Sequence, residues 1–176
     1  MKCVVVKNYN HGDNMTEKSR PIFSKMLDNF KKVYGDGSLK HVADVIGGKV
    51  AVNIEMGIKD PNTGFTNGCA IRMSYALNYS ENNITRGIWN TVSGADKKWY
   101  IYRVQDLINY LTQNFGSADK VIKHPKSENF SNMQGIIVFQ VDWKDATGHA
   151  SLWNGENCSD HCYFDKASEA SIWFLK

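Results

Sequence analysis

The sequence contains no long apolar run and little of what separates one domain from another. No stretch approaches the ~18 consecutive apolar residues of a membrane-spanning helix, so we expect no membrane insertion. There are only three prolines, all isolated, and no repeat or low-complexity tract. A chain of 176 residues without a linker fits one folded unit. We therefore predict a single domain over residues 1–176.

An excess of charge of one sign is also missing. The formal net charge is +3, and the lysines and arginines are scattered among acidic residues. Domains that bind nucleic acid concentrate their basic residues on one face or along one helix. The sequence has no such basic stripe, so nucleic acid is excluded as an expected partner.

Two features of the sequence disagree about the compartment in which the protein works. The N-terminal apolar patch, Cys3 to Val6, is shorter than the ~7–15 apolar residues of a secretory signal. This predicts synthesis in the cytoplasm without a signal peptide. However, Cys158 and Cys162 lie four positions apart, close enough for a small disulfide in an oxidising compartment. Cytosolic thiols stay reduced.

Hydrophobic periodicity predicts helices first and strands last. Apolar residues at three- and four-residue spacing indicate helices at 19–34, 39–46, 69–78 and 102–115, and Gly35, Gly47 and Gly116 follow three of them. Residues 136–143 and 149–153 are β-branched or alternate, which is typical of a hairpin, and 170–176 resemble a further strand. This order predicts an α+β fold with N-terminal helices packed on an antiparallel sheet.

Cys69 begins one of these helices and is the first candidate for a reactive residue. Asn67 is a good N-cap, and the first turn of a helix, with its unpaired N–H groups, favours a negative charge such as a thiolate. The same N–H groups can hold the oxyanion of a tetrahedral intermediate. Cys69 also shares an apolar stripe with Met73 and Leu77, so a buried, inert cysteine is the alternative interpretation.

A reactive thiol normally needs a general base and a group that orients the base. His149 is the best placed of the five histidines, because it follows the Gly148 turn and begins a strand. Asp160 lies beyond the Asn154–Gly155 turn, where the chain can return beside that strand, and it can orient the imidazole. Three other carboxylates compete with Asp160 for this role: Asp142, Asp145 and Asp165.

Two further interpretations concern the same part of the chain. Cys158, His161 and Cys162 could bind zinc, but the set lacks a CxxC pair and a fourth ligand, so we expect no metal. The alternation of the strand places Trp153 on the same face as His149, and we expect this aromatic side chain at a substrate cleft.

Three blocks of sequence together resemble a known family. They are "NGCAIRMSYALN" at 67–78, "GHASLWNG" at 148–155 and "CSDHC" at 158–162. The chain resembles the type VI secretion amidase effector 4 family, papain-like cysteine peptidases that one Gram-negative bacterium injects into another. The resemblance covers roughly residues 20–175, and the three blocks occur in the order of the family.

The resemblance implies a fold, a site and an activity. The fold would be papain-like and related to the NlpC-type endopeptidases, with Cys69 as nucleophile, His149 as base and Asp160 as the orienting acid. The family is described as cleaving the γ-D-glutamyl–meso-diaminopimelate bond of peptidoglycan stem peptides, without a cofactor. The family also implies a disulfide, here Cys158–Cys162, and a cognate immunity protein that blocks the active site. Delivery by the secretion apparatus into the target periplasm would reconcile a missing signal peptide with a disulfide.

Two other classes of protein remain as alternatives. In a non-catalytic secreted binding domain, Cys69 would be part of the core and the C-terminal cysteines only a structural disulfide. In a cytosolic thiol transferase, Cys158 and Cys162 would be reduced.

Overall fold

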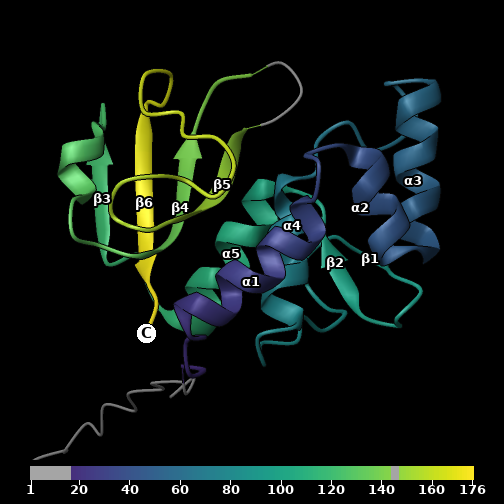
Figure 1. Cartoon of the computed structure of the whole chain (residues 1–176), viewed down its shortest axis with the longest axis horizontal. Coiled ribbons are helices and arrows are strands. Elements are labelled where there is room, and N and C mark those ends of the chain that lie inside the picture. The colour runs from purple at the N-terminus through teal and green to yellow at the C-terminus, as the bar shows by residue number, and fades with distance from the viewer. Residues whose placement is uncertain (1–16, 144–146) are drawn as a thin grey trace, which may run out of the picture.

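The computed structural model describes residues 17–143 and 147–176. The five α-helices precede the four strands of the main sheet, as predicted, but two short strands come before the last of these helices (Figure 1). The elements are α1 (Phe23–Tyr34), α2 (Leu39–Ile46), α3 (Gly48–Lys59), α4 (Cys69–Asn78), β1 (Thr91–Ser93), β2 (Trp99–Ile101), α5 (Val104–Phe115), β3 (Lys120–Lys123), the 3-10 turn η1 (Ser127–Phe130), β4 (Gly135–Gln140), β5 (Gly148–Trp153) and β6 (Glu169–Phe174).

The main sheet has four antiparallel strands in the order β3-β6-β4-β5. The predicted hairpin is confirmed, since β4 pairs with β5 in a register that sets Phe139 opposite His149. Strand β5 is at the edge of the sheet that faces the helices (Figure 1). All six of its residues are buried, because α4 and α5 pack against it. Ala150 and Leu152 face these helices, whereas His149 alternates with them and lies on the other face of β5, which it shares with Trp153.

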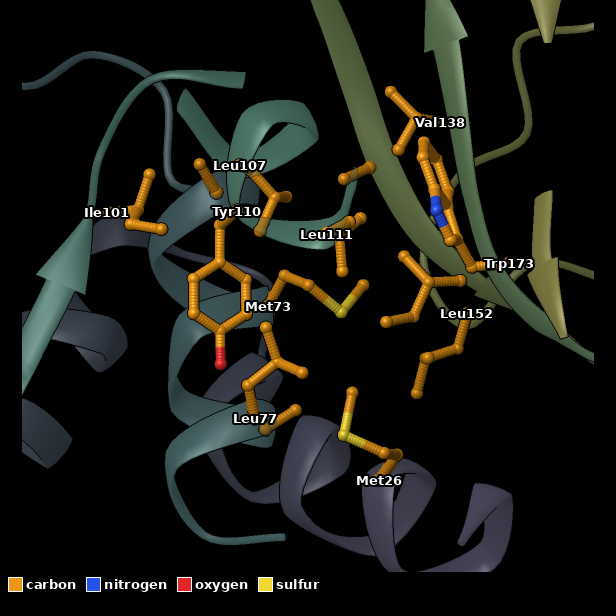
Figure 2. Packing of buried hydrophobic residues seen from close by; sticks show 14 of the residues in the cluster. Met26, Met73, Leu77, Ile101, Leu107, Tyr110, Leu111, Val138, Leu152 and Trp173 are labelled. Carbon is orange, nitrogen blue, oxygen red and sulfur yellow. The ribbon is translucent and has the colours of Figure 1, made fainter. Parts of the chain in front are cut away.

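Helix α4 lies at the centre of the largest hydrophobic cluster. Met73 and Leu77 on α4 meet Met26 of α1 on one side and Leu152 of β5 on the other (Figure 2). Nine of the ten residues of α4 are buried, which is unusual for a helix that also carries Arg72, Ser74 and Asn78. A helix enclosed on most sides is held rigidly, so Cys69 at its start has a fixed position relative to β5.

Only part of the predicted layering is correct. Helix α1 packs on α4, but α2 and α3 lie away from the main sheet and share a second cluster with the β1–β2 ribbon (Figure 1). Helix α3 was missed, and so were β1, β2 and β3. Gly57 lowers the helix propensity of α3, yet a side chain there would collide with the backbone carbonyl of Phe65. The close packing of α3 on the backbone at Phe65 therefore requires Gly57, and Gly57 is also the residue that weakens the helical pattern of this segment.

The glycine helix ends are confirmed. The N–H of Gly35 bonds to the Lys31 carbonyl and that of Gly116 to the Thr112 carbonyl, and both glycines have positive φ. Helix α1 begins at Phe23, not at the predicted Ser19–Pro21, since the residue before it is extended. Within the described ranges, no helix has both the length and the apolar character required to cross a bilayer.

Candidate active site

The N-terminus of α4 positions Cys69. Cys69 is the first helical residue, its N-cap is Gly68, and Asn67 lies one residue earlier, so the prediction of Asn67 as N-cap is wrong. The Asn67 side chain nevertheless accepts a hydrogen bond from the Cys69 backbone N–H, with N···Oδ1 at 3.0 Å. The N–H that we expected to find free for an oxyanion is therefore occupied in the free protein.

Cys69 is buried, as the alternative interpretation of an inert core cysteine predicted. It is 2% exposed and belongs to the central hydrophobic cluster. Its surroundings separate the two interpretations, because its thiol lies close enough to the His149 imidazole to help raise the pKa of that ring. An inert core cysteine has no such partner, whereas a nucleophile activated by a base requires one.

Strand β5 and the loop after it bring His149 and Asp160 together. The His149 Nε2 and Asp160 Oδ2 atoms are 2.9 Å apart, and the two side chains are 8% and 2% exposed. The ring N–H is not aimed directly at the oxygen, so the contact is an ion pair more than a linear hydrogen bond. Because Nε2 faces the carboxylate, Nδ1 is the ring nitrogen available to the thiol.

The loop that carries Asp160 folds back along β5, as the sequence suggested. The Ser159 N–H donates to the Leu152 carbonyl at 2.8 Å, and Cys158 forms a β-bridge with Trp153. A disulfide joins Cys158 to Cys162 and encloses Asp160. Neither sulfur is then a free thiolate, so Cys158 and Cys162 provide neither two zinc ligands nor the reduced pair that a thiol transferase needs.

The competing carboxylates are placed differently. Asp142 and Asp165 are exposed, and neither forms an ion pair with a described residue. Asp145 lies outside the described residues. Asp160 is the carboxylate that contacts His149.

Electrostatics favour a charged His149. Burial lowers its pKa, but the contacts with Asp160 and with the Cys69 thiol outweigh burial and raise the pKa from 6.5 to about 9. Burial raises the pKa of Asp160, but His149 and the Ser151 hydroxyl outweigh it, so the net change is downward. Near neutral pH, the site is thus an imidazolium that bridges a carboxylate and a sulfur.

These residues border a cleft of about 600 Å³. Cys69 itself is nearly enclosed, but its neighbour Gly68 and its partner His149 both line the cleft. Aromatic side chains form much of the wall, and the His149 ring lies edge-on to Tyr163 with centroids 4.9 Å apart. The lining residues are Tyr34, Gly37, Leu39, Thr66, Asn67, Gly68, Arg72, Trp143, His149, Asp160, His161 and Tyr163.

The prediction of Trp153 at the cleft is wrong. Trp153 is 1% exposed, and its Nε1–H donates to the Phe130 carbonyl at 2.9 Å, within the third hydrophobic cluster. Trp143 lines the cleft instead and packs edge-on against Tyr163. Alternation along β5 correctly indicated that Trp153 shares a face of the strand with His149. However, this face borders the cleft only at His149 and is buried in the core at Trp153.

Sequence reasoning also missed Ser151 and Arg72. Ser151 is fully buried between His149 and Trp153 on β5, and its hydroxyl donates to Asp160 Oδ1 at 2.5 Å. The alternation that placed it beside His149 was the available signal. Arg72 lines the cleft one turn after Cys69, and a charged residue inside an otherwise buried helix was a signal as well.

The comparisons with known proteins show the family of this chain. A family model described as "Type VI secretion system (T6SS), amidase effector protein 4" matches residues 65–174. The chain belongs to this amidase effector family. The matched region contains Cys69, His149 and Asp160, together with all of α4, α5 and the main sheet.

Solved structures of the family resemble the whole described fold. The effector Tae4 of Salmonella typhimurium, in complex with the immunity protein Tai4 of Enterobacter cloacae, is 40% identical with a TM-score of 0.82 over 89% of this chain and 100% of that one. The Enterobacter cloacae effector Tae4 on its own is 40% identical with a TM-score of 0.81, over 91% and 99%. No curated protein sequence gave a match.

Proposed function

We propose that this protein hydrolyses the γ-D-glutamyl–meso-diaminopimelate bond of peptidoglycan stem peptides as a papain-like cysteine amidase. The observation that carries the proposal is the connected series of the Cys69 thiol, the His149 ring and the Asp160 carboxylate at the edge of the cleft. Membership of an amidase family favours catalysis over the non-catalytic binding domain. A nucleophile on a central helix opposite a histidine on an antiparallel sheet supports the papain-like description.

The reaction would proceed through an acyl-enzyme. The Cys69 thiolate attacks the amide carbonyl, and the tetrahedral intermediate collapses as the His149 imidazolium gives its proton to the leaving amine. This leaves a thioester on Cys69 and a neutral imidazole. His149 then takes a proton from water, the hydroxide attacks the thioester, and the released thiolate is paired again with an imidazolium.

Asp160 would keep the imidazole in the orientation and protonation state that each step needs. With a pKa of about 9, His149 holds its proton near neutral pH and can donate it to the amine. The carboxylate is itself held by the Ser151 hydroxyl, so it does not need to rotate during the cycle. Preorganised charges of this kind avoid the reorganisation that water would require.

In the tetrahedral intermediate, the oxyanion would replace the Asn67 side chain as the acceptor of the Cys69 backbone N–H. In the free protein this N–H donates to the Asn67 side chain, which is half-buried at the cleft wall. Release of that bond also frees the Asn67 amide, whose own N–H₂ group can turn toward the developing negative charge. Two donors would then stand beside the scissile carbonyl.

The family and its solved complexes support a proposal about the biological setting of this protein. The Salmonella typhimurium and Enterobacter cloacae effectors were crystallised with immunity proteins named Tai4. We propose that this protein likewise has a cognate immunity protein that covers its cleft. It would act in the periplasm of the target cell after delivery by a type VI apparatus, where the Cys158–Cys162 disulfide is stable.

The test uses purified sacculi and defined muropeptides with the wild-type and Cys69→Ala proteins. We expect the wild type to release new amino termini, with fragment masses that correspond to cleavage between glutamate and diaminopimelate, and Cys69→Ala to release none above background. Asp165→Asn, an exposed change in the same C-terminal region, is the control and should act like the wild type. Release of new termini by Cys69→Ala would overturn the assignment of the nucleophile, and different fragment masses would overturn the bond.

A further inference from the structure

Arg72 is a cation in the wall of the cleft, next to the nucleophile. It lies three residues after Cys69 on α4, and residues at this spacing on a helix have Cβ atoms ~5–6 Å apart. Arg72 is 8% exposed, and its side chain lines the same cleft as Asn67 and His149. The catalytic steps described above do not use it.

The charge of Arg72 has no carboxylate partner within residues 17–143 and 147–176. One terminal nitrogen donates to the Gly37 carbonyl at 2.7 Å, and the guanidinium lies 5.3 Å from the centroid of the Tyr34 ring. The buried Nε–H has no acceptor there. A carbonyl and an aromatic face compensate a buried cation only in part, because an isolated charge in such a site loses much of its hydration. An anion in the cleft would complete the pairing.

Gly68 packs beside this guanidinium. A Cβ atom on Gly68 would lie 3.5 Å from the guanidinium carbon of Arg72 and 3.6 Å from one of its terminal nitrogens, and the Leu39 Cδ2 methyl would be nearer still, at 2.8 Å. Gly68 itself lines the cleft and directly precedes Cys69. The cationic group is therefore adjacent to the backbone at the point where the scissile amide must sit.

We propose that the Arg72 guanidinium binds the free carboxylate of the residue that contributes the scissile carbonyl, and so selects γ-linked glutamyl substrates. This inference rests on the proposed function and specifies its substrate recognition. In a γ-glutamyl amide, the α-carboxylate stays free and lies four bonds, roughly 5 Å, from the scissile carbon. In an ordinary α-peptide bond, the α-carboxyl group of the residue that contributes the carbonyl is itself part of the amide, so no free α-carboxylate remains on that residue. Guanidinium groups recognise carboxylates well because their donors match the two oxygens.

A purely structural role is the alternative, since Arg72 also ties α4 to the α1–α2 connection through Gly37 and Tyr34. Loss of that tie would reduce activity on every substrate equally. Loss of a carboxylate site would reduce activity only on substrates with the carboxylate. The comparison of two substrates by one variant therefore separates these roles, because the folded fraction of the variant cancels in the ratio.

The first experiment measures kcat/KM for L-alanyl-γ-D-glutamyl-meso-diaminopimelate and for the same peptide with the glutamyl α-carboxylate converted to a carboxamide. We expect the wild type to prefer the carboxylate by ~10–100-fold, the range of one charge-assisted interaction. Arg72→Gln should reduce this preference to less than about threefold, and Arg72→Lys should keep part of it. Arg103→Gln is the matched control, because Arg103 also lies over a tyrosine ring but is exposed and outside the cleft. An equal loss on both peptides would overturn the proposal.

The second experiment needs no substrate, so it still tests the anion site if the proposed function fails. Iodoacetate and iodoacetamide alkylate the same thiol and differ mainly in the negative charge of iodoacetate. The rate of alkylation of Cys69 by each reagent is measured by intact mass. We expect the rate with iodoacetate divided by the rate with iodoacetamide to be lower by about tenfold or more in Arg72→Gln than in the wild type. The same ratio should be unchanged in Arg103→Gln. A ratio unchanged by Arg72→Gln would refute anion binding at Arg72. If neither peptide is cleaved but the alkylation ratio is lower in Arg72→Gln, the proposed substrate would be refuted and the anion site at Arg72 would be retained.

Discussion

The ion pair between His149 and Asp160 leads to a prediction about the pH dependence of the enzyme. In Asp160→Asn, the side chain keeps its size and an oxygen that can accept from Nε2–H. The Ser151 hydroxyl, which now donates to Asp160 Oδ1, can turn and accept from the new amide instead. The fold around the loop should therefore persist, and the change removes one negative charge 2.9 Å from the His149 ring.

The distance sets the scale of the effect. At an effective dielectric constant of ~20, two unit charges at 2.9 Å attract each other by roughly 6 kcal/mol, which is an upper limit for the pair. The pKa of His149 is raised from 6.5 to about 9 by Asp160 and Cys69 together, against the effect of burial. That difference of about 2.5 pH units corresponds to roughly 3 kcal/mol. Without the carboxylate we expect the pKa of His149 to fall by about 1.5–2.5 pH units.

The direction of the change in activity follows from the role of the imidazolium. In the proposed mechanism, His149 must carry its proton at the start of the reaction, so the alkaline limb of kcat/KM reports the loss of that proton in the free enzyme. We expect this limb near pH 9 in the wild type and ~1.5–2.5 units lower in Asp160→Asn, with kcat reduced at every pH. NMR titration of the His149 ring gives the same quantity if turnover is too slow. Asp165→Asn is the control, and an alkaline limb that stays in place in Asp160→Asn would refute the electrostatic role of Asp160.

Two further predictions concern the support of Asp160. Ser151→Ala removes a donor to a buried carboxylate and should lower kcat about tenfold and stability by about 1.5–3 kcal/mol in a denaturant titration. Ser159→Ala, whose hydroxyl bonds only to a backbone carbonyl, is the matched control, and equal effects of the two changes would contradict the role of Ser151. Replacement of Cys158 and Cys162 by serine opens a loop of about five residues, worth about 2 kcal/mol, and should lower the melting temperature by about 4–8 °C. We expect a larger proportional loss of kcat than of folded protein, and kcat equal to wild type in this variant would show that the disulfide does not position Asp160.

The long amphipathic elements could be predicted from the sequence, whereas the short or enclosed ones could not. Helix α5 and the β4–β5 hairpin have one buried face each, and that face produces the periodic pattern. The three residues of β1 and of β2 are too few to show a period. Helix α3 has only three buried residues, and one of them is Gly57, which is there because the backbone at Phe65 passes close by. Such a contact depends on tertiary packing that no local window contains.

The proximity of Cys69, His149 and Asp160 could be predicted, but their supporting contacts could not. A cysteine at a helix start and a histidine at a strand start are local patterns, and both lie where the sequence suggested. The N-cap of α4 is Gly68, one residue later than predicted, and the Asn67 side chain accepts a hydrogen bond from the Cys69 N–H. The sequence did not indicate this shift of one residue. Helix boundaries are the least predictable feature of a helix.

Trp143 and Trp153 show the same limit on the sheet. Alternation indicates which face of a strand a side chain occupies, but not how far along the strand that face stays open. On β5, the face is open at His149 and closed by Phe130 and Phe164 at Trp153. Trp143 was predicted as the last residue of the strand 136–143, but β4 ends at Gln140 and Trp143 lines the cleft from the segment that follows.

Charge balance links the catalytic residues to the proposed role of Arg72. In the proposed mechanism, the His149 imidazolium lies between the Asp160 carboxylate and the sulfur of Cys69, which attacks as a thiolate. In the acyl-enzyme, the thiolate has become a neutral thioester and the imidazole has lost its proton, so the buried Asp160 carboxylate is left without a charged partner. That imbalance raises the proton affinity of His149 at the moment when it must take a proton from water. An unpaired substrate carboxylate in the cleft would raise the proton affinity of His149 further. His149 would then give its proton less readily to the leaving amine of a substrate. Pairing of that carboxylate with Arg72 would confine the effect to Asp160, so the same guanidinium that selects the substrate would also keep the substrate charge from disturbing His149.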